Sequence, residues 1–286
     1  MKLMSFRFDG SVRHGVVEND EVHELGDGDL QLLIERSFPL RHADLGEPRA
    51  VRRLSDVSLC APLLRPGKLL AAAANYQDHV TETGGDPLDK TNLSPRLFLK
   101  PPTCIVGPGE PLDLPEMSKQ VDWEAELGVV IGARAKDVRV ESALDYVAGY
   151  LSANDVSART IDHAFTPNYA DKAVWFFDWL AGKWFDGFAP MGPYLVTADE
   201  VPDPQDLSVR FELNGLSRQN GSTKDMIFSV AELIAHASRL MTLEPGDIIL
   251  TGTPSGVGAA TGEFVSSGDT MAVTIGNLGT LVTPVR

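Results

Sequence analysis

The segment of residues 122–132, Asp-Trp-Glu-Ala-Glu-Leu-Gly-Val-Val-Ile-Gly, constrains the fold more than any other part of this 286-residue chain. Its run of Gly-Val-Val-Ile is typical of a β-strand that is buried on both faces. Because side chains alternate along a strand, Glu124 and Glu126 should point to one face, and apolar neighbours such as Trp123 to the other. The sequence therefore predicts a core strand that carries two adjacent carboxylates at its rim.

Two neighbouring carboxylates repel each other, and burial makes that repulsion more costly, so a positive charge should lie between them. Asp155 ends a second apolar segment, residues 146–156, and is the candidate for a third acid. Three oxygen ligands without a His or Cys cluster suit Mg²⁺, Mn²⁺ or Ca²⁺ better than zinc. Spacing alone leaves two alternatives open, a solvated acidic strand edge and a pair of acids neutralised by Lys or Arg.

The remaining pattern predicts an α+β fold that is mainly β. The 26 Gly and 19 Pro residues are typical of many turns between short strands. Predicted strands include residues 69–73, 96–100, 127–132, 194–196, 208–213, 247–251 and 270–275. Predicted helices are residues 29–36, 142–148, 169–181 and 229–241. We expect a small β-rich N-terminal domain at residues 1–62 and a larger domain at residues 63–286.

Charge and composition exclude several kinds of partner. A formal net charge of −15 provides no basic field for nucleic acid. No apolar run is long enough to span a bilayer, and no signal-peptide pattern is seen, so we expect a cytoplasmic protein with no membrane partner. Cys60 and Cys104 are far apart and are expected as free thiols.

A possible catalytic base follows the predicted strand at residues 69–73. Asn75 can cap a short helix in which His79 and Glu82 lie on one face. A histidine oriented by a carboxylate is a suitable general base, although a solvated surface pair would show the same spacing. Lys183 lies in an apolar and aromatic stretch, where a buried ammonium would need an acidic partner.

Five segments between about residue 65 and the C-terminus form a recognisable set. They are Asn-Tyr-Gln-Asp-His-Val-Thr-Glu at 75–82, Asp-Trp-Glu-Ala-Glu-Leu-Gly at 122–128, Gly-Tyr-Leu-Ser-Ala-Asn-Asp-Val-Ser-Ala-Arg at 149–159, Gly-Lys-Trp-Phe-Asp-Gly-Phe-Ala-Pro-Met-Gly-Pro at 182–193 and Leu-Glu-Pro-Gly-Asp-Ile-Ile-Leu-Thr-Gly-Thr-Pro at 243–254. Together, and in this order, they resemble the fumarylacetoacetate hydrolase superfamily, in its bacterial acylpyruvase and 2-hydroxyhepta-2,4-diene-1,7-dioate isomerase-like branch. The resemblance implies a mixed β-sandwich or rolled β-barrel.

The resemblance also implies roles for individual residues. Mg²⁺ or Mn²⁺ would be bound by Glu124, Glu126 and Asp155, and Ca²⁺ could take the same place in crystals. His79 and Glu82 would form a water-activating pair on a mobile lid, and Lys183 would polarise the substrate. The implied substrate-binding residues are Tyr76, Lys100, Thr253, Arg218 and Gln219. Arg159 could support Asp155 by an ion pair.

The implied activity is hydrolysis of a carbon–carbon bond in a small anionic β-diketo acid, through an enolate that the metal stabilises. Decarboxylation of a β-keto acid and keto–enol isomerisation are alternatives on the same site, and a non-catalytic binding protein is a third. Family members are usually homodimers. Two departures bear on the substrate: Asp162 replaces a common Gln, which would disfavour a second carboxylate there, and Trp184 replaces a serine. The aromatic segment at residues 160–181 could serve packing, a dimer contact or a reshaped pocket.

Overall fold

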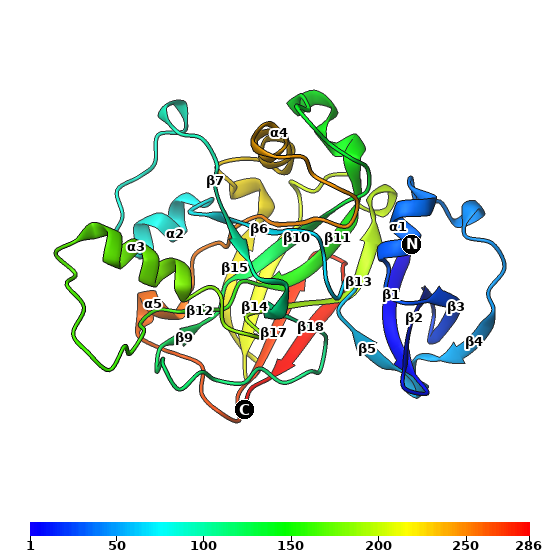
Figure 1. The fold of residues 1–286 in the computed structure, drawn as a ribbon, viewed down its shortest axis with the longest axis horizontal. Helices are drawn as coiled ribbons and strands as arrows, with labels where there is room; N and C mark the ends of the chain where they lie inside the picture. Colours follow the sequence, from blue (N-terminus) through cyan, green and yellow to red (C-terminus); the bar gives the residue numbers. More distant parts are fainter.

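A computed structural model describes residues 1–286 and has a large mixed β-sheet at its centre (Figure 1). This sheet has 12 strands, ten of them in the order β4-β3-β2-β1-β13-β11-β10-β16-β6-β7, while β5 pairs with β1 and β8 with β13. Its strands are β1 (Lys2–Phe8), β2 (Ser11–Glu18), β3 (Glu21–Asp27), β4 (Ala50–Arg53), β5 (Ser58–Cys60), β6 (Leu69–Ala73), β7 (Arg96–Lys100), β8 (Ile105–Val106), β10 (Ala125–Ile131), β11 (Val147–Asn154), β13 (Ala189–Thr197) and β16 (Ile248–Leu250).

Two smaller sheets and the helices complete the fold. A four-stranded sheet contains β14 (Ser208–Leu213), β15 (Leu216–Ser222), β17 (Thr270–Ile275) and β18 (Thr280–Pro284), and β9 (Val121–Asp122) pairs with β12 (Ser157–Ala158). The α-helices are α1 (Gln31–Ser37), α2 (Gln77–Glu82), α3 (Lys172–Ala181), α4 (Val230–Leu240) and α5 (Gly258–Thr261). Short 3-10 helices span His42–Asp44, Leu54–Asp56, Lys90–Asn92, Pro102–Cys104, Val140–Tyr146, Ala198–Glu200 and Thr223–Asp225. The expected α+β fold with a dominant β component is confirmed.

Strand β10 is buried along its whole length because different apolar layers cover its two faces. Val129 belongs to a 33-residue core that includes residues of α4 and of the four-stranded sheet. Val130 points into a second core of 19 residues, which includes residues of α1. Trp123 stacks on Phe211 with ring centroids 4.9 Å apart. The two cores hold β10 rigidly, so the acids at its end are carried by a fixed support.

Several local predictions need correction. The predicted helix at 142–148 is a 3-10 helix, Val140–Tyr146, and α3 begins three residues later than predicted, at Lys172, where the Asp171 side chain accepts a hydrogen bond from the Ala173 N–H. Asn75 does not cap α2, because its amide is used elsewhere: it donates to the Thr251 carbonyl and accepts from the Phe228 N–H. Tyr76 occupies the cap position without a side-chain hydrogen bond.

The N-terminal strands extend the large sheet at one end, shown in blue in Figure 1, where β1 pairs with β13. The domain boundary between residues 62 and 63 stays a prediction. The five α-helices are all too short or too polar to cross a lipid bilayer.

Candidate metal centre and active site

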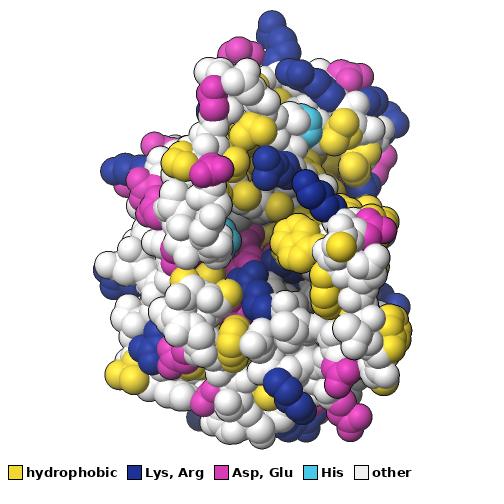
Figure 2. Space-filling model, turned by 90° about the vertical axis from the view of Figure 1, so that its left-hand side faces the viewer, with side chains coloured by type: hydrophobic (Ala, Val, Ile, Leu, Met, Phe, Trp, Pro, Cys, Tyr) yellow, Lys and Arg dark blue, Asp and Glu magenta, His cyan; other side chains and the backbone are white.

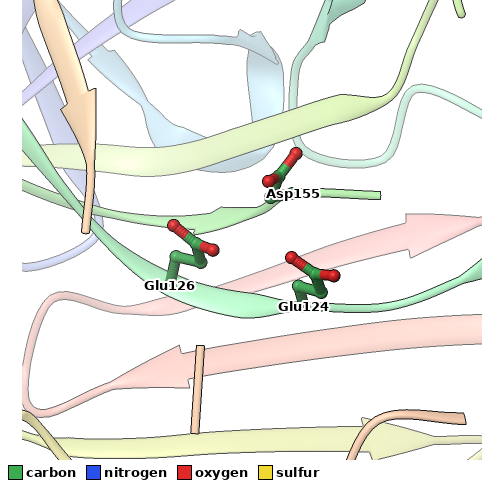
Figure 3. A group of neighbouring side chains, drawn as sticks. All are labelled: Glu124, Glu126 and Asp155. Atoms are coloured by element: carbon green, nitrogen blue, oxygen red, sulfur yellow. The ribbon is translucent and has the colours of Figure 1, made fainter. Parts of the chain in front are cut away.

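The buried side chains of Glu124, Glu126 and Asp155 lie close together (Figure 3). Glu124 immediately precedes β10, Glu126 lies within it, and Asp155 follows the end of β11. Antiparallel pairing of β10 with β11 brings these chain segments together. One carboxylate oxygen from each residue lies within 4.8 Å of the others, and all three residues are buried. Three oxygen ligands at this separation form a cluster that could hold a divalent cation.

Basic side chains surround the three acids, which we call the acid cluster. Lys183 Nζ lies 2.7 Å from Glu124 Oε2 and 2.8 Å from Asp155 Oδ2. Lys100, whose side chain is fully buried, contacts Asp155 Oδ1. Arg159 Nη2 lies 2.8 Å from Glu124 Oε1. The predicted ion-pair neutralisation by Lys and Arg is therefore present, and the solvated strand edge is excluded.

Arg159 is bound differently from our expectation. It pairs with Asp122, to which its Nε donates at 2.8 Å, and with Glu124, but not with Asp155. The predicted support of Asp155 was wrong because the chain after Asp155 forms β12, so a spacing of four residues does not bring side chains together as in a helix. Asp122 also accepts from the N–H groups of Gly258 and Ala259. Sequence reasoning had missed Asp122, whose sequence position offered no signal beyond its place in the acid-rich segment.

The cations are distributed unequally over the acid cluster. Burial raises the pKa of Glu124, but the charges of Lys183 and Arg159 outweigh burial and hold that pKa well below its usual range. For Glu126, burial and the charges of Asp155 and Glu124 together raise the pKa well above the usual range. Glu126 makes one hydrogen bond, from the Gly252 N–H at 2.7 Å, and no ion pair.

A divalent cation fits this imbalance. The four buried acids here, Asp122 included, outnumber the three basic side chains Lys100, Lys183 and Arg159. An ion held by the three clustered carboxylates would give Glu126 the positively charged partner that it lacks. The centre as a whole would then carry an excess of positive charge. Such a centre would attract an anionic substrate despite the protein's overall negative charge.

Helix α2 carries the predicted His–Glu pair. His79 Nδ1 lies 3.0 Å from Glu82 Oε1, and Glu82 Oε2 accepts from the Gly256 N–H at 2.7 Å. The side chains are only 14% and 17% exposed, so this is not a solvated surface pair. Positive charge on His79 lowers the pKa of Glu124, which places the imidazole within electrostatic range of the acid cluster.

One segment connects the pair on α2 with the acid cluster: residues 252–259, which comprise the connection after β16 and the first two residues of α5 and are called the loop below. Its backbone N–H groups bind three acidic side chains from distant parts of the chain: Gly252 binds Glu126, Gly256 binds Glu82, and Gly258 and Ala259 bind Asp122. The Thr253 hydroxyl donates to the Ala125 carbonyl at 2.9 Å. The loop therefore fixes the His79–Glu82 pair and the acid cluster relative to each other.

The predicted substrate-binding residues lie in different environments. Tyr76 is buried near Glu126, whose charge adds to burial in raising the tyrosine pKa, and its hydroxyl has no hydrogen-bond partner. Gln219 is also buried and braces the start of β10, accepting from the Ala125 N–H and donating to Thr253. Arg218 is partly exposed and pairs with Glu263 at 2.8 Å. Of the five residues predicted for substrate binding, Tyr76 is the one with a buried side-chain polar atom that has no hydrogen-bond partner.

Asp162 lies outside the acid cluster. Its carboxylate is exposed and accepts from the Ala164 N–H.

The face that carries α2 and α3 is hollowed, as Figure 2 shows. Acidic and basic side chains gather in the hollow, and hydrophobic side chains border it. The hollow lies on the same face as α2, the helix that carries His79 and Glu82.

Comparisons with known proteins agree with this arrangement. The family model described as fumarylacetoacetate (FAA) hydrolase C-terminal matches residues 68–286. A mitochondrial oxaloacetate tautomerase of Xenopus laevis is 43% identical over 233 residues, which are 81% of this chain and 69% of that protein.

Two solved structures match over nearly their whole length. Fumarylacetoacetate hydrolase from the psychrophile Exiguobacterium antarcticum superimposes with a TM-score of 0.84 at 35% identity, covering 100% of this chain and 99% of that one. A 2-hydroxyhepta-2,4-diene-1,7-dioate isomerase from Mycobacterium marinum gives a TM-score of 0.77 at 34% identity, covering 100% and 98%. The chain therefore belongs to the fumarylacetoacetate hydrolase family.

Proposed function

We propose that this protein is a divalent-metal-dependent hydrolase that cleaves a carbon–carbon bond in a small β-diketo acid such as an acylpyruvate. Mg²⁺ or Mn²⁺ would be held by Glu124, Glu126 and Asp155. When bound, the ion would draw electron density from the carbonyl oxygens of the substrate. The substrate would be an anion, attracted by the local positive charge.

His79 acts as the base. Because Glu82 accepts at Nδ1, the proton of the neutral ring lies on Nδ1, and Nε2 is left to take a proton from water. The activated water attacks the acyl carbonyl, and Glu82 stabilises the imidazolium that results. Bond cleavage then releases one carboxylic acid and the enolate of a second oxo acid, which His79 can reprotonate.

Lys183 neutralises negative charge that develops on the substrate. Two of its three N–H donors are directed at Glu124 and Asp155, which leaves one for a substrate oxygen. The Tyr76 hydroxyl is a second donor that no protein group uses. Both lie beside the acid cluster, where the oxygens of a bound oxo acid would be.

The observation that carries this proposal is the pairing of a base with an acid cluster through one loop. Glu82 binds His79 with one oxygen and Gly256 with the other, and the same loop binds Glu126 through Gly252. A protein that only bound an oxo acid would have no use for an oriented histidine beside the binding site. The non-catalytic alternative is therefore disfavoured.

Tautomerisation of oxaloacetate is the second candidate, favoured by the 43% identity to the Xenopus laevis tautomerase. In that reaction His79 would move a proton between carbon and oxygen without attack by water. Decarboxylation of a β-keto acid would use the same electron withdrawal. A homodimeric state and a cytoplasmic location stay predictions.

The test is turnover of acetylpyruvate and oxaloacetate by protein stripped with EDTA and then reloaded with Mg²⁺ or Mn²⁺. We expect acetylpyruvate cleavage only with metal, and a loss of about 10²–10⁴-fold in the His79→Ala variant. His42→Ala, which changes an exposed histidine paired with Glu18, is the matched control and should keep full activity. Oxaloacetate tautomerisation without acetylpyruvate cleavage would favour the second candidate, and no turnover with either would favour the binding protein.

A further inference from the structure

The side of the acid cluster that faces α3 is aromatic. Phe98 lies on β7 two residues before Lys100, so the two side chains share one face of the strand. The Phe98 ring centroid is 5.6 Å from Lys183 Nζ. The same ammonium binds Glu124 and Asp155, so the phenyl ring is a direct neighbour of the proposed metal ligands.

Trp179 extends this surface from α3. Its ring packs edge-on against Phe98, with centroids 5.1 Å apart and an interplanar angle of 71°. Both side chains are half-buried, so part of each ring is open to solvent. Hydrophobic side chains border the hollow seen in Figure 2. We call Phe98 and Trp179 the aromatic wall.

Polar contacts from the C-terminal half of α3 and from the residues just after it hold the aromatic wall in place. Asp178 accepts from the Tyr169 hydroxyl at 3.0 Å and lies 3.0 Å from His163 Nε2. After the helix, the Trp184 indole N–H donates to the Leu99 carbonyl on β7 at 2.9 Å. These contacts tie α3 to β7 and to the preceding loop, so the wall is a fixed surface.

We propose that the aromatic wall binds the acyl end of the substrate and selects an apolar group there, aryl or branched alkyl, over a second carboxylate. This inference rests on the proposed function, which places the oxo-acid end at the acid cluster. A carboxylate beside the two rings would lose water and meet the negative faces of the aromatic systems. The ammonium next to Phe98 binds two carboxylates, and the proposed function assigns its third N–H to the oxo-acid end of the substrate, so it has no donor left for a second carboxylate. An apolar group would instead be buried against both rings.

Turnover of three β-diketo acids tests the proposal: benzoylpyruvate, acetylpyruvate and maleylpyruvate, with Mg²⁺ present. The unmodified protein should have a higher kcat/KM for benzoylpyruvate than for maleylpyruvate. Trp179→Ala and Phe98→Leu should each lower the benzoylpyruvate-to-acetylpyruvate ratio of kcat/KM about tenfold, and Trp179→Phe should restore most of it. Phe177→Ala is the matched control, because that ring is 63% exposed on the same helix, and it should leave the ratio unchanged.

Binding measurements separate this proposal from the proposed function. Phenylglyoxylate and mesoxalate share a 2-oxo acid group but carry a phenyl and a carboxylate respectively, and oxalate carries no further group. In titrations with Mg²⁺ present, the unmodified protein should bind phenylglyoxylate more tightly than mesoxalate. Trp179→Ala and Phe98→Leu should each weaken the binding of phenylglyoxylate about tenfold and leave the binding of oxalate unchanged. Tighter binding of mesoxalate than of phenylglyoxylate would overturn the proposal that the aromatic wall selects an apolar group. A benzoylpyruvate-to-acetylpyruvate ratio of kcat/KM that is unchanged in both variants would also overturn it. Absence of any turnover with these affinities intact would instead count against the proposed function alone.

Discussion

The substitution Glu126→Gln distinguishes between two explanations of the acid cluster: a site that binds a metal ion, and a site whose charge is neutralised by lysine side chains alone. Glu126 is the one acid of the cluster without a cation partner, and its pKa is raised by burial and by the charges of Asp155 and Glu124. Glutamine has nearly the same shape and can still accept from the Gly252 N–H. The substitution therefore removes negative charge with little change in packing.

The two states of the protein should respond in opposite directions. Without metal, burial and the neighbouring acids make the carboxylate form of Glu126 unfavourable in the folded protein, so Glu126→Gln should melt at the same temperature as the parent protein or higher. With metal, a ligand that binds only the folded chain contributes about 2.7 kcal/mol at a concentration about one hundred times its Kd. For a chain of this size that corresponds to a rise in Tm of roughly 5 °C in the parent protein. The variant should show little of this rise.

The pH dependence has a definite sign. A carboxyl whose folded-state pKa is raised contributes stability below its ordinary value of 4.5, and this contribution is lost as the pH rises through the folded-state pKa. Metal-free parent protein should therefore lose stability relative to Glu126→Gln as the pH rises above 4.5.

Calorimetric melts with EDTA and with Mg²⁺, across a pH series, measure all three effects. Glu116→Gln is the control, since this glutamate is exposed and makes no ion pair, and it should behave as the parent protein does. Equal Mg²⁺ stabilisation of Glu126→Gln and the parent protein would show that Glu126 does not bind the metal.

Three further variants probe the base, the loop and the ammonium. His79→Ala should keep the full rise in Tm with Mg²⁺ while losing acylpyruvate cleavage, and a parallel loss of metal binding would contradict separate roles for base and cluster. Gly256→Ala should lower activity because it shifts Glu82: Gly256 has φ +103°, and an added Cβ would lie 2.1 Å from the Arg218 carbonyl oxygen. Steady-state kinetics measure the loss of activity. A chemical-denaturation curve measures the stability cost, which we expect to be about 1–3 kcal/mol. Lys183→Met should cost about 3–5 kcal/mol in metal-free protein, since it leaves two buried carboxylates without that partner, and Mg²⁺ should recover part of it in the same denaturation assay.

The sequence predicted those features that depend on local pattern. The apolar run after Glu126 identified β10 as a doubly buried strand, and alternation placed the two glutamates on one side of it. The start of α4 follows from a capping box in which the Ser229 side chain accepts from the Glu232 N–H and the Glu232 side chain accepts from the Ser229 N–H. The assignment of Asp155 and of the His–Glu pair depended more on family resemblance than on spacing.

Contacts between distant parts of the chain lay beyond local pattern. The second partner of Glu82 is a backbone N–H 174 residues away, and no sequence spacing indicates it. Asn75 was expected to cap a helix, but tertiary contacts with Thr251 and Phe228 take up its amide. Arg159 was placed by helical spacing in a segment that forms a strand. In each case the tertiary fold determined the partner of a polar group.

The most direct test of the account is a crystal structure of the protein grown with Mn²⁺, with an anomalous-difference map recorded at the manganese absorption edge. If the acid cluster holds the metal, the map will contain one strong peak coordinated by oxygens of Glu124, Glu126 and Asp155, and the Lys183 ammonium will be displaced from at least one of its carboxylate contacts or shared with a bound anion. A map without a peak among these three carboxylates, with Lys183 and Lys100 still in their present ion pairs, would contradict it.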